Sequence, residues 1–129
     1  MPASARQVLG NRGQGLAKKY FIDRGYTLLG ENVRLGHSEI DLIVRRGDTT
    51  VFVEVKTRSN DFFGTPEEAV TKQKIAAVAR GIALYIRKHP RTPHVRFDVV
   101  AVFWPNRTAT PTVRHYPAVG EGAALAFLE

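Results

Sequence analysis

The sequence has no cysteine among its 129 residues, which excludes disulfides, cysteine-ligated zinc and thiol catalysis. It also has no apolar run near the roughly 20 residues that cross a bilayer. Its first residues, MPASARQVLG, lack the apolar stretch of a secretory signal. We therefore expect a cytoplasmic protein with no membrane partner, forming a single domain over residues 1–129 that buries one core.

Acidic residues are missing from one long segment. Between Ala69 and Phe97 the chain has seven basic residues and no acidic one, and the whole chain has 19 Lys+Arg against 12 Asp+Glu, a formal net charge of +7. This balance suits a polyanionic partner such as nucleic acid. A solvated helix face explains it equally well, so charge alone leaves both interpretations open.

Hydrophobic spacing and turn residues predict the element order α-β-β-β-α-β-β-α, a mixed β-sheet flanked by α-helices. A first helix is expected to stop at Gly25. A second is expected from Pro66 to about Lys88, because Thr65, Pro66 and Glu68 fit a capped helix start. The expected strands cover residues 26–34, 39–45, 50–57 and 95–104, with a short edge strand at 112–116 and a candidate terminal helix at 120–129.

The two strands around Gly47-Asp48 carry the most information. Apolar residues alternate along both, and a two-residue turn with glycine first fixes how the strands pair. Counting outward from that turn places Asp41 opposite Glu54 and Glu39 opposite Lys56. The pattern thus predicts two carboxylates and an ammonium group side by side on one sheet surface.

Like charges directly opposite each other destabilise a strand pair, so a cation is expected between Asp41 and Glu54. Mg²⁺ (or Mn²⁺) prefers hard oxygen ligands, often uses one or two carboxylates, and keeps bound waters. Lys56 lies on the same face and could polarise a phosphate oxygen. The alternative is a wet face without metal, in which Asp41 forms a salt bridge with Arg58 or Lys74.

Several motifs together are similar to a known family. They are SEIDLI around Asp41, VFVEVKTR around Glu54, FGTPEEAV followed by Lys74, RFDVV, ENVR and the N-terminal RGQGLAKKYFIDRGY. Over about residues 12–103 the chain resembles the YraN-like family of predicted bacterial endonucleases, in the PD-(D/E)XK (restriction-endonuclease-like) superfamily. The chain also resembles the archaeal Holliday-junction resolvases, which share the nuclease fold.

The resemblance implies a single restriction-endonuclease-like domain with an α/β fold. It implies that Asp41, Glu54 and the main-chain carbonyl of Val55 bind the metal, and that Lys56 is the catalytic lysine. The function implied is a Mg²⁺-dependent endonuclease that hydrolyses DNA phosphodiester bonds, acting on branched or repair intermediates.

Gln14 departs from the family pattern, because relatives usually have a glutamate at this position in the first helix. Ser38 departs as well, since relatives commonly have glycine there. An amide oxygen of Gln14 can ligate a metal but brings no charge, so replacing Gln14 by Glu is expected to raise activity if the position contributes. The alternative function is a catalytically weak or silent nucleic-acid-binding module of the same fold.

Other polar residues have weaker assignments. The candidate nucleic-acid contacts are Arg58, Lys72, Gln73 and Lys74. Asp98 is interpreted as structural and paired with an arginine, and the four histidines as loop residues without metal-ligand spacing. The edge strand at 112–116 could supply a homodimer contact. A third, structural function, in which the charged hairpin binds only a protein partner, stays open.

Overall fold

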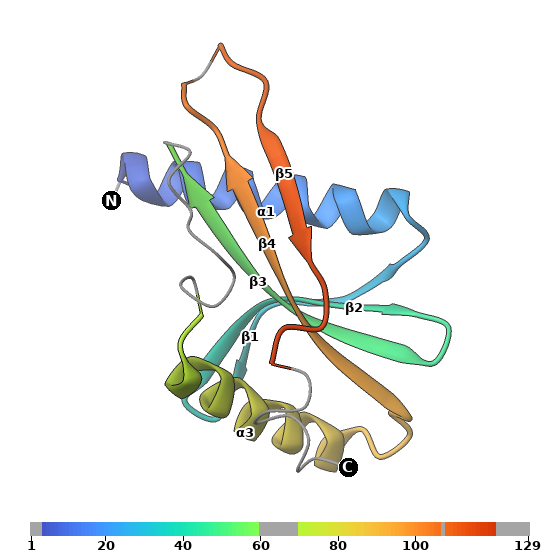
Figure 1. Cartoon of the computed structure of the whole chain (residues 1–129). Helices are drawn as coiled ribbons and strands as arrows, with labels where there is room; N and C mark the ends of the chain where they lie inside the picture. The colour runs from blue at the N-terminus through green and yellow to red at the C-terminus, as the bar shows by residue number, and fades with distance from the viewer. Residues whose placement is uncertain (1–3, 60–69, 107, 121–129) are drawn as a thin grey trace.

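In the computed structural model, residues 4–59, 70–106 and 108–120 are described. Their five strands form one mixed sheet, in which sheet order follows chain order from β1 to β5. This confirms the predicted mixed α/β architecture, which is compatible with a restriction-endonuclease-like fold (Figure 1). The elements are α1 (Ala5–Asp23), β1 (Thr27–Leu35), β2 (Ser38–Arg46), β3 (Thr49–Arg58), α3 (Lys72–Lys88), β4 (His94–Phe103) and β5 (Thr112–Tyr116).

The helices cover opposite faces of the sheet, so the described residues form two hydrophobic clusters, one on each face, and not the one core that was predicted. On one face, Ala17 and Phe21 of α1 pack against the strands. On the other, Val78 and Ile82 of α3 pack against Phe52 and its neighbours. The hairpin surface that carries the predicted polar site is therefore a buried apolar layer over much of its length. Neither described helix is long and apolar enough to cross a membrane.

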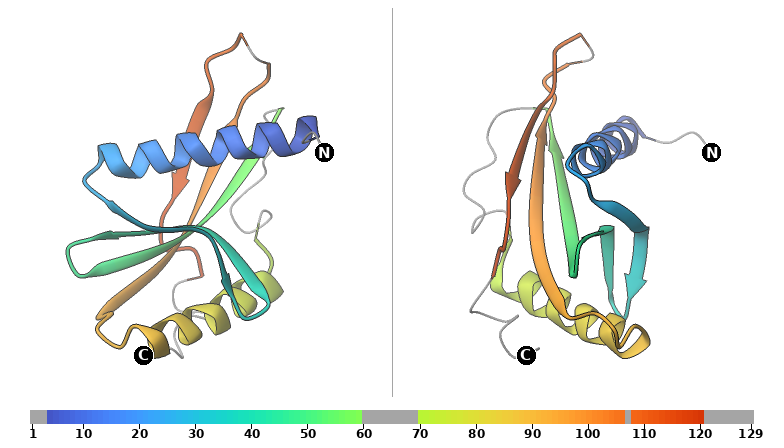
Figure 2. Two further views of the ribbon diagram at one scale, coloured as in Figure 1. Left: turned by 180° about the vertical axis from the view of Figure 1, so that it is seen from behind. Right: turned by 90° about the vertical axis from the view of Figure 1, so that its right-hand side faces the viewer.

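The hairpin register agrees with the prediction near the turn, where Arg46 pairs with Thr49 and Ile43 with Phe52. The β2–β3 ladder then ends at the Leu42–Val53 pair. Beyond that pair β2 departs from a regular strand. Ile40 and Leu42 would share a face in a regular strand, but Ile40 belongs to the α3-side core and Leu42 to the α1-side core. Figure 2 shows the strong curvature of β1 and β2.

The second helix begins later than predicted. Val70 and Thr71 are not helical, and the hydroxyl of Thr71 caps the helix by accepting a hydrogen bond from the Lys74 N–H at 3.1 Å. A continuous helix from Pro66 to Lys88 is therefore wrong. The capping residues expected at Thr65–Glu68 lie outside the described residues, as does the candidate terminal helix from residue 121 onward.

Candidate metal and nucleic-acid site

Asp41 lies where β2 and β3 separate, one residue beyond the last ladder pair. Its Oδ2 accepts a hydrogen bond from the Val55 N–H at 2.7 Å, in place of a strand carbonyl. Because the N–H and C=O of one residue point to the same side of a strand, the Val55 carbonyl also faces this gap. The register count predicted that Asp41 and Glu54 form a pair in the ladder. They do not, and instead they are neighbours across an opening between the two strands.

The carboxyl group of Asp41 is short of compensating charge. Burial is the largest cause that raises its pKa from 3.8 to about 6, and the hydrogen bond from Val55 opposes that rise. The charge of Glu54 raises the pKa further, whereas Lys74 and Lys56 lower it by smaller amounts. An added cation would therefore stabilise the ionised form of Asp41.

Glu54 is buried, with 8% of its surface exposed, and two lysines bracket its carboxylate. The Lys56 Nζ lies 3.3 Å from Oε1, and the Lys74 Nζ lies 3.4 Å from Oε2. The predicted partner of Lys56, Glu39, is exposed, and Lys56 pairs with Glu54 instead. Lys74 does reach the site, but it binds Glu54 and not Asp41.

Gln14 reaches the same point from α1. A Cβ atom on the preceding residue, Gly13, would lie 1.9 Å from Oγ1 of Thr57, so only glycine lets the helix approach β3 this closely. The Gln14 Nε2 donates to Oδ1 of Asn32 at 3.1 Å and to the main-chain oxygen of Asp41 at 3.3 Å. The structure therefore places Gln14 beside Asp41, and its role as a metal ligand stays a prediction.

Asn32 is the site residue that the sequence interpretation missed. It lies in β1 with a φ of 49°, the left-handed region in which asparagine is one of the few tolerated residues besides glycine. The ENVR motif contained it, but nothing in a strand pattern signals such a backbone. Its exposed side chain nevertheless contacts Gln14 at the site.

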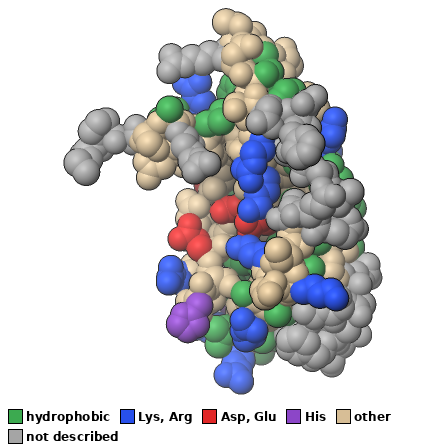
Figure 3. All heavy atoms as spheres, turned by 60° about the vertical axis from the view of Figure 1, so that its left-hand side comes forward, with side chains coloured by type: hydrophobic (Ala, Val, Ile, Leu, Met, Phe, Trp, Pro, Cys, Tyr) green, Lys and Arg blue, Asp and Glu red, His purple; other side chains and the backbone are tan. Residues whose placement is uncertain are grey.

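Gln14 and Asn32 line an open cleft of about 970 Å³, whereas Glu54 and Lys74 do not line it. Asp41, Lys56 and Arg58 all contribute to its wall, so the structure brings Arg58 to the site as predicted. Lys72 and Gln73, in the first turn of α3, are exposed and do not line this cleft. On the face drawn in Figure 3, acidic side chains gather beside Lys and Arg side chains.

The donor set fits a hard divalent cation. The described residues contain no group of three or more His, Asp or Glu side chains suited to a metal. The ligands of a bound metal would therefore be the two carboxylates of Asp41 and Glu54, the neutral oxygens of Val55 and Gln14, and water. Such a mixture suits Mg²⁺, which binds through few carboxylates and keeps several waters, better than it suits zinc.

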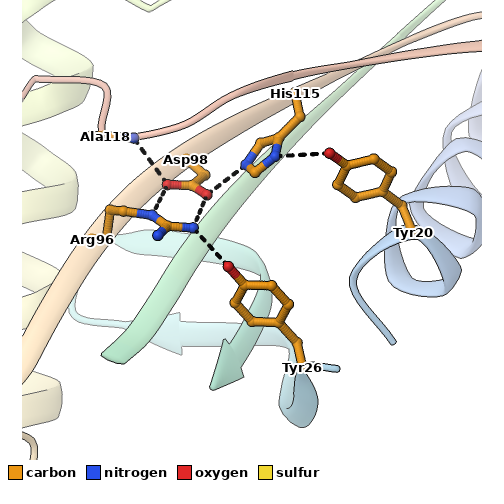
Figure 4. Close-up of polar contacts among 6 residues, drawn as sticks. All are labelled: Tyr20, Tyr26, Arg96, Asp98, His115 and Ala118. Carbon is orange, nitrogen blue, oxygen red and sulfur yellow. Dashed lines mark hydrogen bonds and ion pairs between the residues drawn. The ribbon is translucent and has the colours of Figure 1, made fainter. Parts of the chain in front are cut away.

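A second buried acid, Asp98, lies in β4 and is fully enclosed, with 0% of its surface exposed (Figure 4). Arg96 donates to both carboxylate oxygens, from Nε and Nη2, at 2.8 Å each. Nε2 of His115 lies 2.6 Å from Oδ2, and the Ala118 N–H donates to Oδ1 at 3.1 Å. The predicted pairing of Asp98 with an arginine is therefore confirmed, and the arginine is Arg96.

Two tyrosines complete this cluster, and no buried side-chain nitrogen or oxygen in the described part of the chain lacks a partner. The Tyr20 hydroxyl lies 3.1 Å from Nδ1 of His115, and the Tyr26 hydroxyl accepts from Arg96 at 3.1 Å (Figure 4). His115 is therefore a strand residue of β5 with a structural role, and its interpretation as a loop residue is wrong. Although burial acts to raise the pKa of Asp98, the hydrogen bonds hold it below its usual value.

Residues 13–102 match a family described as "Uncharacterised protein family UPF0102". A UPF0102 protein of Clavibacter michiganensis is 45% identical over 108 residues, which cover 83% of this chain and 91% of the relative. Another from Syntrophomonas wolfei is 43% identical over 95 residues, covering 73% and 83%. A third, from Corynebacterium glutamicum, is 41% identical over 119 residues, covering 92% and 96%. The chain therefore belongs to the uncharacterised protein family UPF0102, in agreement with the YraN-like resemblance of its motifs.

Proposed function

We propose that this protein is a Mg²⁺-dependent endonuclease of the PD-(D/E)XK superfamily that hydrolyses DNA phosphodiester bonds. One observation carries the proposal: the carboxylates of Asp41 and Glu54 meet the Lys56 ammonium group at the opening between β2 and β3. The basic charge of the chain and the Arg58 side chain in the cleft support a polyanionic substrate.

Each residue of the site has a role in this proposal. Asp41, Glu54 and the Val55 carbonyl would hold Mg²⁺ or Mn²⁺, which when bound supplies Lewis-acid activation of water and phosphate. Lys56, already 3.3 Å from Glu54, can donate to a phosphate oxygen and stabilise the negative charge that grows during hydrolysis. Arg58 can position the DNA backbone without reading its sequence.

The proposal extends to partners and location. Lys72 and Gln73 are exposed at the start of α3, on the helix that also delivers Lys74, and would contact phosphates beyond the cleft. Branched or repair intermediates in the cytoplasm are the proposed substrates. β5 is an edge strand, so pairing between two copies could form a homodimer with two active sites.

The test is nicking of branched, single-stranded and duplex DNA by the purified protein with Mg²⁺ or Mn²⁺. Asp41→Ala and Lys56→Ala should each abolish cleavage while the fold survives. Asp48→Ala is the matched control, because Asp48 is an exposed acid in the hairpin turn, and it should cleave normally. Cleavage that persists in the Asp41→Ala/Lys56→Ala double variant would exclude this active site.

A second candidate is a nucleic-acid-binding module without hydrolysis. Two features favour it: Gln14 brings no charge to the site, and both Lys56 and Lys74 already neutralise Glu54. Calorimetry would then detect no Mg²⁺ binding, while DNA affinity would fall steeply with salt because phosphate contacts release counterions. A DNA affinity that does not change with salt would contradict both candidates.

A further inference from the structure

We propose that Asn32 is a positioning residue that holds the Gln14 side-chain amide in one orientation, leaving its carbonyl oxygen as the atom offered to the cleft. The orientation is a property of the free protein. Its use in metal binding rests on the proposed function.

Three elements converge to make this contact. In the β1–β2 ladder, Glu31 pairs with Leu42 and Val33 pairs with Ile40, so Asn32 falls opposite Asp41. The close approach of α1 to β3 at Gly13 brings Gln14 against the same point. Both Gln14 and Asn32 line the cleft beside Asp41.

Hydrogen-bond donors decide which way the Gln14 amide points. A primary amide has two N–H donors, and here each has an acceptor: Oδ1 of Asn32 at 3.1 Å and the main-chain oxygen of Asp41 at 3.3 Å. No hydrogen bond reaches Oε1 of Gln14 from any other residue in the described part of the chain. The oxygen is thus the remaining polar atom of this side chain, and it is free to accept or to ligate.

The backbone of Asn32 supports a functional reason for this residue. Its φ of 49° lies in the left-handed region, which costs free energy for residues other than glycine and which asparagine tolerates better than most. Such conformations cluster at functional sites. Glycine would satisfy the backbone alone, so the asparagine side chain is accounted for by its bond to Gln14.

This arrangement changes what a glutamate at position 14 would do. A carboxylate has no donor, so the Gln14→Glu variant would set an oxygen against the Asp41 carbonyl and against Asn32. The Asn32 amide can turn and donate its own N–H, but the carbonyl cannot. Asn32→Asp combined with Gln14→Glu would place two carboxylates in contact, whereas Asn32→Asp alone keeps an acceptor for Gln14.

Hydrogen exchange of the Gln14 side-chain amide, measured by NMR on the metal-free protein, tests the orientation directly. Asn32→Gly keeps the backbone and removes the acceptor, so exchange should quicken about fivefold or more, as expected for loss of one neutral hydrogen bond. Asn32→Asp should keep the slow exchange. Asn11→Ala is the matched control, because Asn11 also lines the cleft, and it should change nothing.

Mn²⁺ titration by calorimetry tests the use of that orientation, and Asn32→Gly should lower Mn²⁺ affinity about tenfold, the usual effect of losing a partner that orients a ligand. Unchanged amide exchange in Asn32→Gly would overturn the positioning role. If Asn32→Gly fails to fold, thermal unfolding of the Asn32→Asp variant decides instead. Asn32→Asp should lower the melting temperature of the Gln14→Glu variant more than that of the wild type. Equal losses in the two backgrounds would overturn the positioning role of Asn32. Mn²⁺ binding that survives Asp41→Ala would defeat the proposed metal site instead, and the metal-free exchange experiment would still decide the role of Asn32.

Discussion

Asp41 and Asp98 are two acids of one sheet with opposite surroundings. Asp98 is the more deeply buried, yet its pKa lies below the usual value because His115, Arg96 and a main-chain N–H all bind its oxygens. Asp41 is only half-buried, yet its pKa is raised to about 6 because burial outweighs its one main-chain hydrogen bond. Burial acts to raise the pKa of both acids; it prevails at Asp41, which has one bound partner, and is outweighed at Asp98, which has several.

The difference separates an acid whose oxygens are all bound by the protein from one that has room for a further partner. Every bond that Asp98 can accept comes from the protein itself, so the cluster has no capacity left for a bound cation. Asp41 keeps unsatisfied negative charge at the wall of an open cleft, where an external cation can reach it. Perturbed acids of the second kind are the ones expected at functional sites.

The largest expected effect is from Asp98→Ala, which removes the acid that Arg96 and His115 share. Breaking a buried ion pair on one side costs about 3–5 kcal/mol of unfolding free energy. Urea unfolding at pH 7 would measure it, with the exposed-site variant Asp48→Ala as a control expected within about 0.5 kcal/mol of wild type. A loss for Asp98→Ala as small as the control's would mean that the two acids do not differ in structural role.

Gly13→Ala should cause the next largest loss of stability. The new methyl group would overlap the Thr57 side chain at the closest approach of α1 to β3, costing about 1–3 kcal/mol by overpacking. Gly10→Ala, in the same helix with no atom within 4 Å of the new Cβ, should be neutral or stabilising. Thermal unfolding of both variants would show whether the cleft depends on this contact; equal melting temperatures would show that it does not.

Asp41→Asn should stabilise the metal-free protein by about 0.5–2 kcal/mol at pH 8, because it removes a buried charge that the surrounding groups compensate only in part. The pKa of Asp41 in the folded state, about 6, exceeds the ordinary value of 3.8. Between these values the folded protein holds a proton that the unfolded chain has lost, so stability falls as pH rises through this window. The gain from Asp41→Asn should therefore shrink between pH 8 and pH 4, as urea unfolding at each pH would show.

Asp98 should show the opposite behaviour. Its pKa is lowered in the folded state, so its contribution is fully present above pH 3.8 and is lost only as the pH falls through that lower pKa. Asp98→Asn should thus lose stability by similar amounts at pH 8 and pH 5.

For the Asp41→Asn variant, a gain in stability that does not change with pH would show that the Asp41 carboxyl group has an ordinary pKa.

The smallest expected effect is from Lys74→Met. Its ammonium group lies 3.4 Å from Glu54, but the side chain is 36% exposed, and Lys56 stays in contact with the same carboxylate. Partly exposed ion pairs contribute up to about 1 kcal/mol. Urea unfolding should therefore change little, and a loss of several times that size would mean that Lys74 stabilises Glu54 as strongly as Arg96 stabilises Asp98.

Much of the fold followed from local rules. The turn at Gly47-Asp48 and the alternating apolar residues fix the hairpin register, and both requirements agree at the Ile43–Phe52 pair. The same count failed at Asp41, because it assumes that two strands stay paired to their ends. Where β2 bends, a side chain replaces a main-chain acceptor, and no periodic pattern encodes that change.

The site residues divide in the same way. Asp41, Glu54 and Lys56 were found because each lies on a strand with a clear pattern. Asn32 was missed because its role depends on one backbone angle and on a helix distant in sequence. His115 was misassigned because its partners, Tyr20 and Asp98, come from α1 and β4, and no single segment contains the contact.

The sheet order follows the chain order throughout, and only the β3–β4 pair is parallel and needs a crossover, which bears on how the protein folds. The β1–β2–β3 meander closes only short loops, so it can form early and carry Asp41 and Glu54 with it. The Asp98 cluster reaches α1 through the contact between His115 and Tyr20, and it exists only once β4 and β5 have docked. We therefore expect Asp41 and Glu54 to come together in the early kinetic phase, and the Asp98 cluster to mark the final step to the native state.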